Sequence, residues 1–415
     1  MTFHRFATLA GYSEGHLRSV ENSRREVTAD VADAYDRVLN SGGMFGARLA
    51  AYQARTDAAS TPWGQDGTTA VLHGLLNVSD VDRRSFVAAS GAALTTVASR
   101  WRSALDLPEP LAATGTRQIN PALVAHIDQR LDHLRHLDDE LGSGDLAALA
   151  RSELAFVAQL LKAGSYTEQI SRRLYSLAAE ASRQVAWDHF DQDNHTTAQR
   201  YFEMALRASA TADDPVTGAY ALSFMAVQCY SIGLGEQAVS LLETARNAVS
   251  GKSTARMAAM LAARSARALS KTGDRRATAH MLHTARTELD QGPHPDDPPT
   301  LYWVTEGEIE MIAGSCALEL GDPAEAIRRF DTAISADYRG EDQYPRSHAI
   351  YMARAAEAHL AMRDLDAAVD RASHAMRCLD GVDSARSKST LAGLRKKLKG
   401  HGEVPLVREF LEATR

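Results

Sequence analysis

The sequence predicts an all-α protein, and two observations carry this prediction. Apolar and small residues recur at three- and four-residue spacing along the chain, whereas no alternation of Val, Ile or Thr persists long enough to indicate strands. Between residues 179 and 380, one small–apolar–small pattern occurs five times, which is typical of stacked helix pairs. With 415 residues, the chain is long enough for a large buried core and for more than one domain.

Each repeat places a small residue, then a large apolar or small residue four positions later, then Ala three positions after that. The five instances are Ala198/Phe202/Ala205, Ala238/Leu242/Ala245, Thr278/Leu282/Ala285, Ala326/Phe330/Ala333 and Ala368/Ala372/Ala375. Twelve residues before each first member lies another small residue, namely Ala186, Ala226, Ala266, Gly314 and Ala356. Small residues allow two helices to approach closely, and Gly233, Gly273 and Gly321 suit turns with positive φ. This pattern resembles the tetratricopeptide repeat family, which implies an α-solenoid over residues 179–380.

Composition and missing motifs favour a soluble binding protein. Hydrophobic residues make up 45% and charged residues 24%, and the net charge of -7 does not indicate a basic nucleic-acid-binding domain. Cys229, Cys316 and Cys378 are too far apart for a disulfide framework or a CxxC metal site, which fits a reducing cytoplasm. No apolar run is long enough to span a membrane. Because P-loop, GxSxG, HExxH and dinucleotide motifs are missing, we expect no enzyme activity and no cofactor.

Residues 1–56 predict a small helical head. Gly11 marks a tight turn, Ser13 and Thr28 are good N-caps, and three short apolar stripes predict three helices. The stripes are Phe6, Leu9 and Ala10; Leu17 and Val20; and Val31, Ala34, Tyr35 and Val38. The spacing of Ala7, Gly11, Leu17 and Val20 resembles the helix-turn-helix of the λ-repressor-like (XRE-type) family. The first helix of that family's domain has no counterpart here, so the motif is truncated.

This resemblance implies that residues 13–19 form a recognition helix facing the major groove of operator DNA. The candidate DNA-binding residues that this resemblance implies are Ser13, Glu14, His16, Arg18, Ser19, Arg24 and Arg25. Arg18 would pair with guanine or phosphate. The alternative is that the head is only a helix pair that caps the repeats.

Residues 57–118 read as a linker with an internal helix. Gly, Pro and Ser enrich residues 41–70, which predicts a loop in which Trp63 docks on a neighbouring domain. Arg83, Arg84 and Phe86 resemble a twin-arginine export signal, but their internal position favours a retained helix that packs Phe86, Val87 and Leu94 inward.

Residues 119–178 predict a helical adaptor, and three long amphipathic helices are expected over Asn120–Gln192. The first of these helices should bury one face, which carries Ile127, Leu131, Leu134 and Leu141.

His133 and His136, on the first adaptor helix, could supply two metal ligands, but a solvated face of mixed charge is the favoured interpretation, so no metal site is expected.

Residues 292–299 contain four prolines and predict a loop that interrupts the array. Residues 381–415 predict capping helices at 385–399 and 404–414, with the basic residues of 394–399 on a solvated face.

The first helix of each pair lines the groove in the family that the repeats resemble. This implies groove-facing residues, listed by position, at Arg183, Trp187, Phe190, Tyr220, Ser223, Val227, Tyr230, Met260, Arg267, Glu308, Met311 and Glu357. Aromatic rings with a few charges suit a peptide. The alternative for Phe190 and Tyr230 is a place in the core between stacked repeats.

The combination of head, internal segment and repeats resembles multidomain helix-turn-helix transcriptional regulators of actinobacteria. That resemblance implies a cytoplasmic protein that binds operator double-stranded DNA, as a homodimer, and senses a peptide or protein partner through its repeats. The alternative is a cytoplasmic protein-interaction scaffold that uses the repeats and does not bind DNA.

Overall fold

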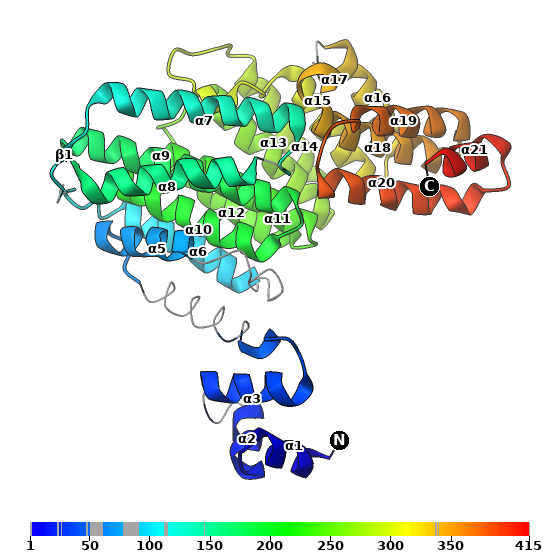
Figure 1. Cartoon of the computed structure of the whole chain (residues 1–415). Helices are drawn as coiled ribbons and strands as arrows, with labels where there is room; N and C mark the ends of the chain where they lie inside the picture. Colours follow the sequence, from blue (N-terminus) through cyan, green and yellow to red (C-terminus); the bar gives the residue numbers. More distant parts are fainter. Residues whose placement is uncertain are drawn as a thin grey trace. The chain divides into compact units, whose positions relative to one another are not determined.

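The computed structural model describes residues 2–22, 25, 27–46, 49, 61–77, 91–111, 115–144, 146–336, 338 and 340–414. These residues confirm the all-α prediction (Figure 1). The only strands among them are β1 (Arg117–Gln118) and β2 (Gly164–Ser165), which form a short parallel pair. Over the same ranges, no helix combines the length and the apolar content that crossing a bilayer requires.

The chain divides into two compact units. One comprises Met1–Pro62 with His73–Ala88, and the other comprises Trp63–Leu72 with Ala89–Arg415. Arg24 and the segment with Arg83, Arg84 and Phe86 lie outside the described residues.

The first unit contains α1 (Phe3–Ala10), α2 (Glu14–Glu21) and α3 (Ala29–Leu39). Gly11 has φ 81° at the end of α1, and the Ser13 hydroxyl accepts a hydrogen bond from the His16 backbone N–H at 3.2 Å, so the predicted turn and N-cap are confirmed. The core contains Phe6, Ala7, Ala10, Leu17, Val20, Val31 and Ala34. Leu9 was wrongly placed in this core: it is 54% exposed, because the buried face of α1 runs through Phe6, Ala7 and Ala10.

The second unit takes in the start of α5 (Gln65–Asn77) and all of α6 (Gly91–Leu105). The loop predicted for residues 41–70 is therefore too long, because residues 65–70 are helical. Trp63 packs under the guanidinium of Arg207, 4.6 Å from its ring centre, and Trp101 of α6 is buried and donates to Ser209. Leu94 of α6 is buried, as predicted.

The three predicted adaptor helices are α7 (Pro121–Leu141), α8 (Ala147–Ala163) and α9 (Glu168–Asp191). Ile127, Leu131 and Leu134 are buried on α7 as predicted. Leu141 is 50% exposed, contrary to the prediction, because α7 ends there and the chain turns at Gly142.

Five helix pairs form the repeats, and each pair packs along its length. Their helices are α9 with α10 (His195–Ala212), α11 (Pro215–Ser231) with α12 (Gly235–Val249), α13 (Ala255–Thr272) with α14 (Arg275–Leu289), α15 (Glu306–Glu319) with α16 (Pro323–Ser335), and α18 (Pro345–Ala361) with α19 (Leu365–Cys378). All members of the repeated pattern are buried except Leu282, which is half-buried. Gly233, Gly273 and Gly321 have φ of 84°, 82° and 78°, so the predicted turns are confirmed.

Shorter elements complete the unit. The Pro-rich residues 292–298 separate α14 from η2 (Pro299–Leu301), which confirms the predicted interruption, and α17 (Gly340–Gln343) precedes α18. The predicted C-terminal helices are α20 (Ala385–Leu398) and α21 (Pro405–Ala413), joined by η3 (Lys399–His401). Leu394 and Leu398 of α20 are buried, whereas Lys396 and Lys397 are exposed.

The adaptor and the C-terminal helices meet, so the repeat array closes on itself. Helix α7 packs against α17 and α18, and α20 packs against α9 (Figure 1). The Asp383 backbone N–H donates to the Leu141 carbonyl at 3.0 Å, and the Gln192 side chain donates to the Asp383 carbonyl at 3.2 Å. Gly142 has φ 80°, and a Cβ atom there would lie 2.5 Å from the Asp383 carbonyl oxygen. Only glycine therefore fits at this junction.

We predict that Gly142→Ala destabilises the second unit by about 2–4 kcal/mol, since it adds a backbone clash to the strain of a positive φ. The control is Gly381→Ala, where φ is also 80° but no atom lies within 4 Å of the added Cβ. Urea unfolding followed by tryptophan fluorescence measures the loss, and faster amide hydrogen exchange in α20 would locate it. Equal losses in the two variants would contradict a role for this close approach.

Candidate functional site

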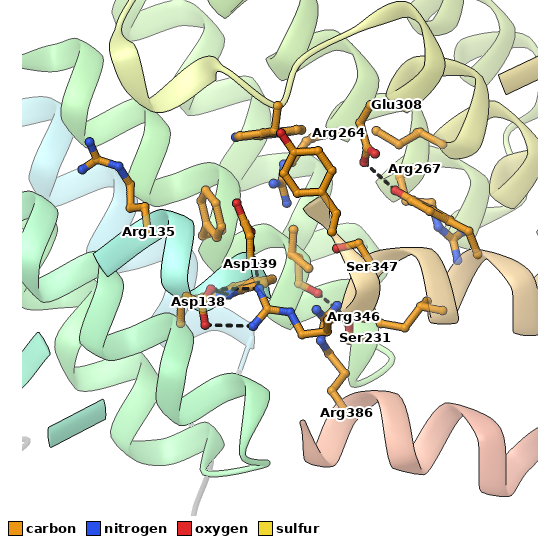
Figure 2. Close-up of a pocket in the computed structure, with 18 of the residues that line it drawn as sticks. Arg135, Asp138, Asp139, Ser231, Arg264, Arg267, Glu308, Arg346, Ser347 and Arg386 are labelled. Carbon is orange, nitrogen blue, oxygen red and sulfur yellow. Dashed lines mark hydrogen bonds and ion pairs between the residues drawn. The ribbon is translucent and has the colours of Figure 1, made fainter. Parts of the chain in front are cut away.

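The interior of the closed array contains a cavity of about 150 Å³. Its walls come from α7, from the first helix of each repeat pair, from the segment before α15 and from the start of α20 (Figure 2). Seven arginines and eight aromatic side chains line it, against three carboxylates. The cavity therefore combines cationic hydrogen-bond donors with flat apolar surfaces.

Most of the predicted groove residues lie in this cavity. The lining includes Arg183, Trp187, Tyr220, Val227, Tyr230, Arg267 and Glu308. Ser223, Phe190, Met260 and Met311 do not line it, because each is buried between helices. Glu357 does not line it either, since it pairs with Lys397 of α20 at 2.8 Å. One residue of register rotates a helical side chain by about 100°, which is enough to move it from the cavity to the core.

Sequence reasoning missed the residues that distant segments bring to the cavity. Asp138 and Asp139 come from α7, Arg386 comes from α20, and Arg346 comes from α18. Arg264, Arg354, Trp303 and Tyr351 were also missed, although they lie on or beside the first helices of repeat pairs, where the correct register would have found them.

A buried ion pair joins α7 to α18. The two terminal nitrogens of Arg346 donate to the two carboxylate oxygens of Asp138 at 2.9 and 2.8 Å, and both side chains are almost fully buried (Figure 2). Asp138 also accepts from Ser143 at 2.6 Å and from the Trp187 indole at 3.1 Å. Burial alone would raise the pKa of Asp138, but the charge of Arg346 and these hydrogen bonds lower it. The carboxylate is therefore ionised and fully hydrogen-bonded, which a buried charge requires.

A second carboxylate extends this network to α20. Asp191 of α9 lies 3.7 Å from Arg346 and 3.2 Å from Arg386, so three helices meet around it. Over the described residues, the neighbouring Asp188 forms no ion pair with an arginine, and its pKa is raised well above the usual value by burial and by the charge of Asp138. The Gln184 amide donates a hydrogen bond to Asp188 at 2.9 Å.

Three arginines of the cavity have no carboxylate within 4.0 Å among the described residues. Arg183 donates to Gln184 and lies over Phe224 at 4.8 Å. Arg264 lies between the rings of Phe224 and Trp303, at 4.6 and 5.0 Å. The Nε atoms of both arginines are buried and lack a hydrogen-bond partner over the described ranges.

The third of these arginines is Arg354, which donates to the Ser315 hydroxyl at 2.9 Å. Burial and the nearby charge of Arg267 lower its pKa to about 10, so it remains a cation at neutral pH. The cavity thus holds positive charge that its own carboxylates do not neutralise.

Two carboxyl groups of the cavity titrate near neutral pH. Burial raises the pKa of Glu308 to about 7, although the Tyr351 hydroxyl donates to it at 2.5 Å. Burial and the charge of Asp138 raise the pKa of Asp139 to about 6, and the Tyr302 hydroxyl donates to this group. The cavity therefore becomes more positive as the pH falls from 8 to 6.

The candidate DNA-binding residues lie on α2 and just beyond it. Arg18 is exposed and lies over the Phe3 ring at 4.8 Å, Ser19 donates to the Gly15 carbonyl, and Arg25 approaches His16 at 3.1 Å. Glu14 is 2.6 Å from His4 and 3.5 Å from Arg18. Ser13 is the N-cap of α2, so its hydroxyl already accepts a backbone hydrogen bond.

Comparison with known proteins gives no relative: no protein-family model matches the chain, and no curated protein is significantly similar to it.

We predict that Arg346→Met, which leaves Asp138 buried without a counter-charge, lowers the stability of the second unit by about 3–5 kcal/mol. Arg346→Met with Asp138→Asn should recover part of this loss, because no ionised group is then stranded. All four tryptophans belong to this unit, so their fluorescence during urea unfolding follows it alone.

The control for this prediction is Arg130→Met, which breaks the more exposed pair with Glu153 and should cost less than about 1 kcal/mol. A loss for Arg346→Met as small as that of the control would show that the buried pair does not hold the array closed.

Proposed function

We propose that the chain is a DNA-binding transcriptional regulator whose helical-repeat unit senses a short acidic peptide. The observation that carries this proposal is the set of cavity arginines with no carboxylate partner in the described part of the chain, namely Arg183, Arg264 and Arg354. A buried cation without a counter-charge is costly, and a bound anion would remove that cost. Arginine is suited to this role because its planar guanidinium can hold a carboxylate with two parallel hydrogen bonds.

The aromatic walls favour a peptide over an inorganic anion. Tyr220, Phe224, Tyr230 and Trp303 give flat apolar surface around the arginines, which would contact side chains or peptide planes of the ligand. A cavity of about 150 Å³ is suited to one end of a peptide, with the remaining residues outside it. The resemblance of the repeats to the tetratricopeptide family supports the same choice, since peptide recognition on the inner surface suits such arrays.

The DNA-binding half of the proposal rests on the head. The helices α1 and α2, the turn at Gly11 and the exposed position of Arg18 support the resemblance to λ-repressor-like heads. One such head buries too little surface for tight specific binding, so we propose a homodimer on a pseudopalindromic operator. A regulator of this kind would act in the cytoplasm, where cysteines stay reduced.

One observation favours the scaffold alternative, in which the repeats bind a partner and the head does not bind DNA. Glu14 belongs to the proposed recognition helix, and the pKa of its carboxyl is lowered chiefly by its hydrogen bond to His4. A charged carboxylate at this place would repel DNA phosphates.

We predict that a pool of random heptapeptides rich in Asp and Glu changes the tryptophan fluorescence of the protein, since Trp187 and Trp303 line the cavity. The matched pool with Asn and Gln in place of the acids should bind far less. Arg264→Gln and Arg354→Gln should each weaken binding by about 10- to 100-fold, because a hydrogen bond to a charged group is lost. Arg246→Gln removes a cation outside the cavity and should have no effect.

The same binding should weaken as the pH rises from 6 to 8. The carboxyl of Glu308 is neutral below its pKa of about 7 and becomes an anion above it, which would repel an acidic ligand. One such charge accounts for about a five-fold loss of affinity. Glu308→Gln should make this part of the profile flatter. Equal binding of the acidic and amide pools would rule out an anion site.

The DNA-binding half is tested by selection from random duplex DNA with the full chain at near-physiological salt. We expect a pseudopalindromic site, and Arg18→Ala should weaken binding to it by about 1–3 kcal/mol and relax the base preference. Arg5→Ala removes an exposed charge from α1 and serves as the control. If folded protein enriches no sequence, the scaffold alternative holds. The selected peptide and the operator should each change the other's affinity for the protein by the same factor, as thermodynamic linkage requires.

A further inference from the structure

A group of metal-ligand side chains lies between the two helices of the last repeat pair, outside the cavity lining. His348 comes from α18, whereas His374 and Cys378 come from α19. One nitrogen of each imidazole and the Cys378 sulfur all lie within 4.8 Å of one another. We infer that these three side chains form a binding site for Zn²⁺.

The fold brings the three donors together without strain. His374 and Cys378 are four residues apart on α19, so both side chains lie on one face of that helix. Ala375 and Ala349, which follow His374 and His348 in the chain, are buried, and such small residues allow α18 and α19 to approach closely. The rings of His348 and His374 meet edge to face at 5.1 Å between centroids, and Tyr338 stacks on His348 at 5.7 Å.

The distances fit a zinc site after a small adjustment. Zinc binds imidazole nitrogen at about 2.0–2.1 Å and thiolate sulfur at about 2.3 Å, so the donors of a tetrahedral site lie about 3.3–3.6 Å apart. The longest separation in the group is at most 4.8 Å, so the donors must approach by no more than about 1.5 Å. His374 is half-buried and is the most exposed of the three donors.

The kinds of donor select the metal. Two imidazoles and one thiolate suit Zn²⁺, whereas Mg²⁺ and Ca²⁺ require oxygen ligands, and this donor group contains no carboxylate. Three protein ligands leave a fourth position for water, and the half-exposed His374 marks the side from which water could reach it. Binding converts the Cys378 thiol to a thiolate and releases its proton to solvent, so no electron transfer is involved.

The site would act on the cavity through helix α18. His348 follows Arg346 by two residues and precedes Tyr351 and Arg354, which line the cavity. A zinc ion that ties α18 to α19 would restrict the helix that carries these three side chains. Zinc would therefore stabilise the second unit, since a ligand that binds only the folded state raises the free energy of unfolding.

The test uses the full chain, reduced and freed of metal by chelation, titrated with Co²⁺ as a spectroscopic substitute for Zn²⁺. We expect one Co²⁺ per chain, with a thiolate-to-cobalt charge-transfer band that Zn²⁺ then abolishes. Cys378→Ser should remove this band and weaken Zn²⁺ binding at least about 100-fold. Cys229→Ser and Cys316→Ser change thiols that are also buried in helices, and they should leave the band intact.

His374→Gln provides a second variant at a position that is only half-buried, and it should weaken Zn²⁺ binding to a similar degree. Circular dichroism of each metal-free variant checks that the helices are intact, so a loss of binding can be assigned to the lost ligand. The proposal is overturned if folded protein binds no stoichiometric metal. It is equally overturned if Cys378→Ser and His374→Gln bind Zn²⁺ as the unmodified chain does.

Discussion

The contact between Asp138 and Arg346 is the constraint on which the architecture of the second unit depends. It joins residues 208 positions apart and holds α7 against α18 by two hydrogen bonds between fully desolvated charges. Taking two charges out of water is unfavourable, and such a pair contributes little net stability compared with apolar side chains of the same size. The pair instead favours one arrangement of the helices, because only the closed array, with Ser143 and Trp187 in place, gives hydrogen-bond partners to both oxygens of the Asp138 carboxylate. An open arrangement would return both charges to water and lose these hydrogen bonds.

The closed array also explains how an acidic chain can have a cationic interior. The net charge of -7 is an average over 415 residues, and it says nothing of where the charges gather. The first helices of the repeat pairs bring arginines to one place, and aromatic rings rather than carboxylates accompany Arg183 and Arg264. Stacking on rings stabilises a guanidinium without neutralising it, so its hydrogen-bond donors stay available.

Local patterns in the sequence predicted the repeats, the capped helices of the head and seven of the cavity residues that lie on first helices. These features depend on contacts between residues close in the chain, where the helical period relates spacing to position. Ser223 and Met311 were misplaced because a small error of register turns a side chain from cavity to core. The contributions of Asp138 and Arg386 could not be predicted, because no local pattern indicates which distant helices will meet. The donor group of His348, His374 and Cys378 was missed for the same reason: the spacing on α19 supplies only two of its members.

The junction at Gly142 and Asp383 has a consequence for how such a protein can evolve. Open repeat arrays grow and shrink readily, because a unit added at one end disturbs only its neighbour. Here α7 and α9 contact α18 and α20, so an inserted or deleted helix pair between them would shift Asp383 away from Leu141 and break their hydrogen bond. The contact between Leu141 and Asp383 therefore restricts how many helix pairs can lie between these two residues.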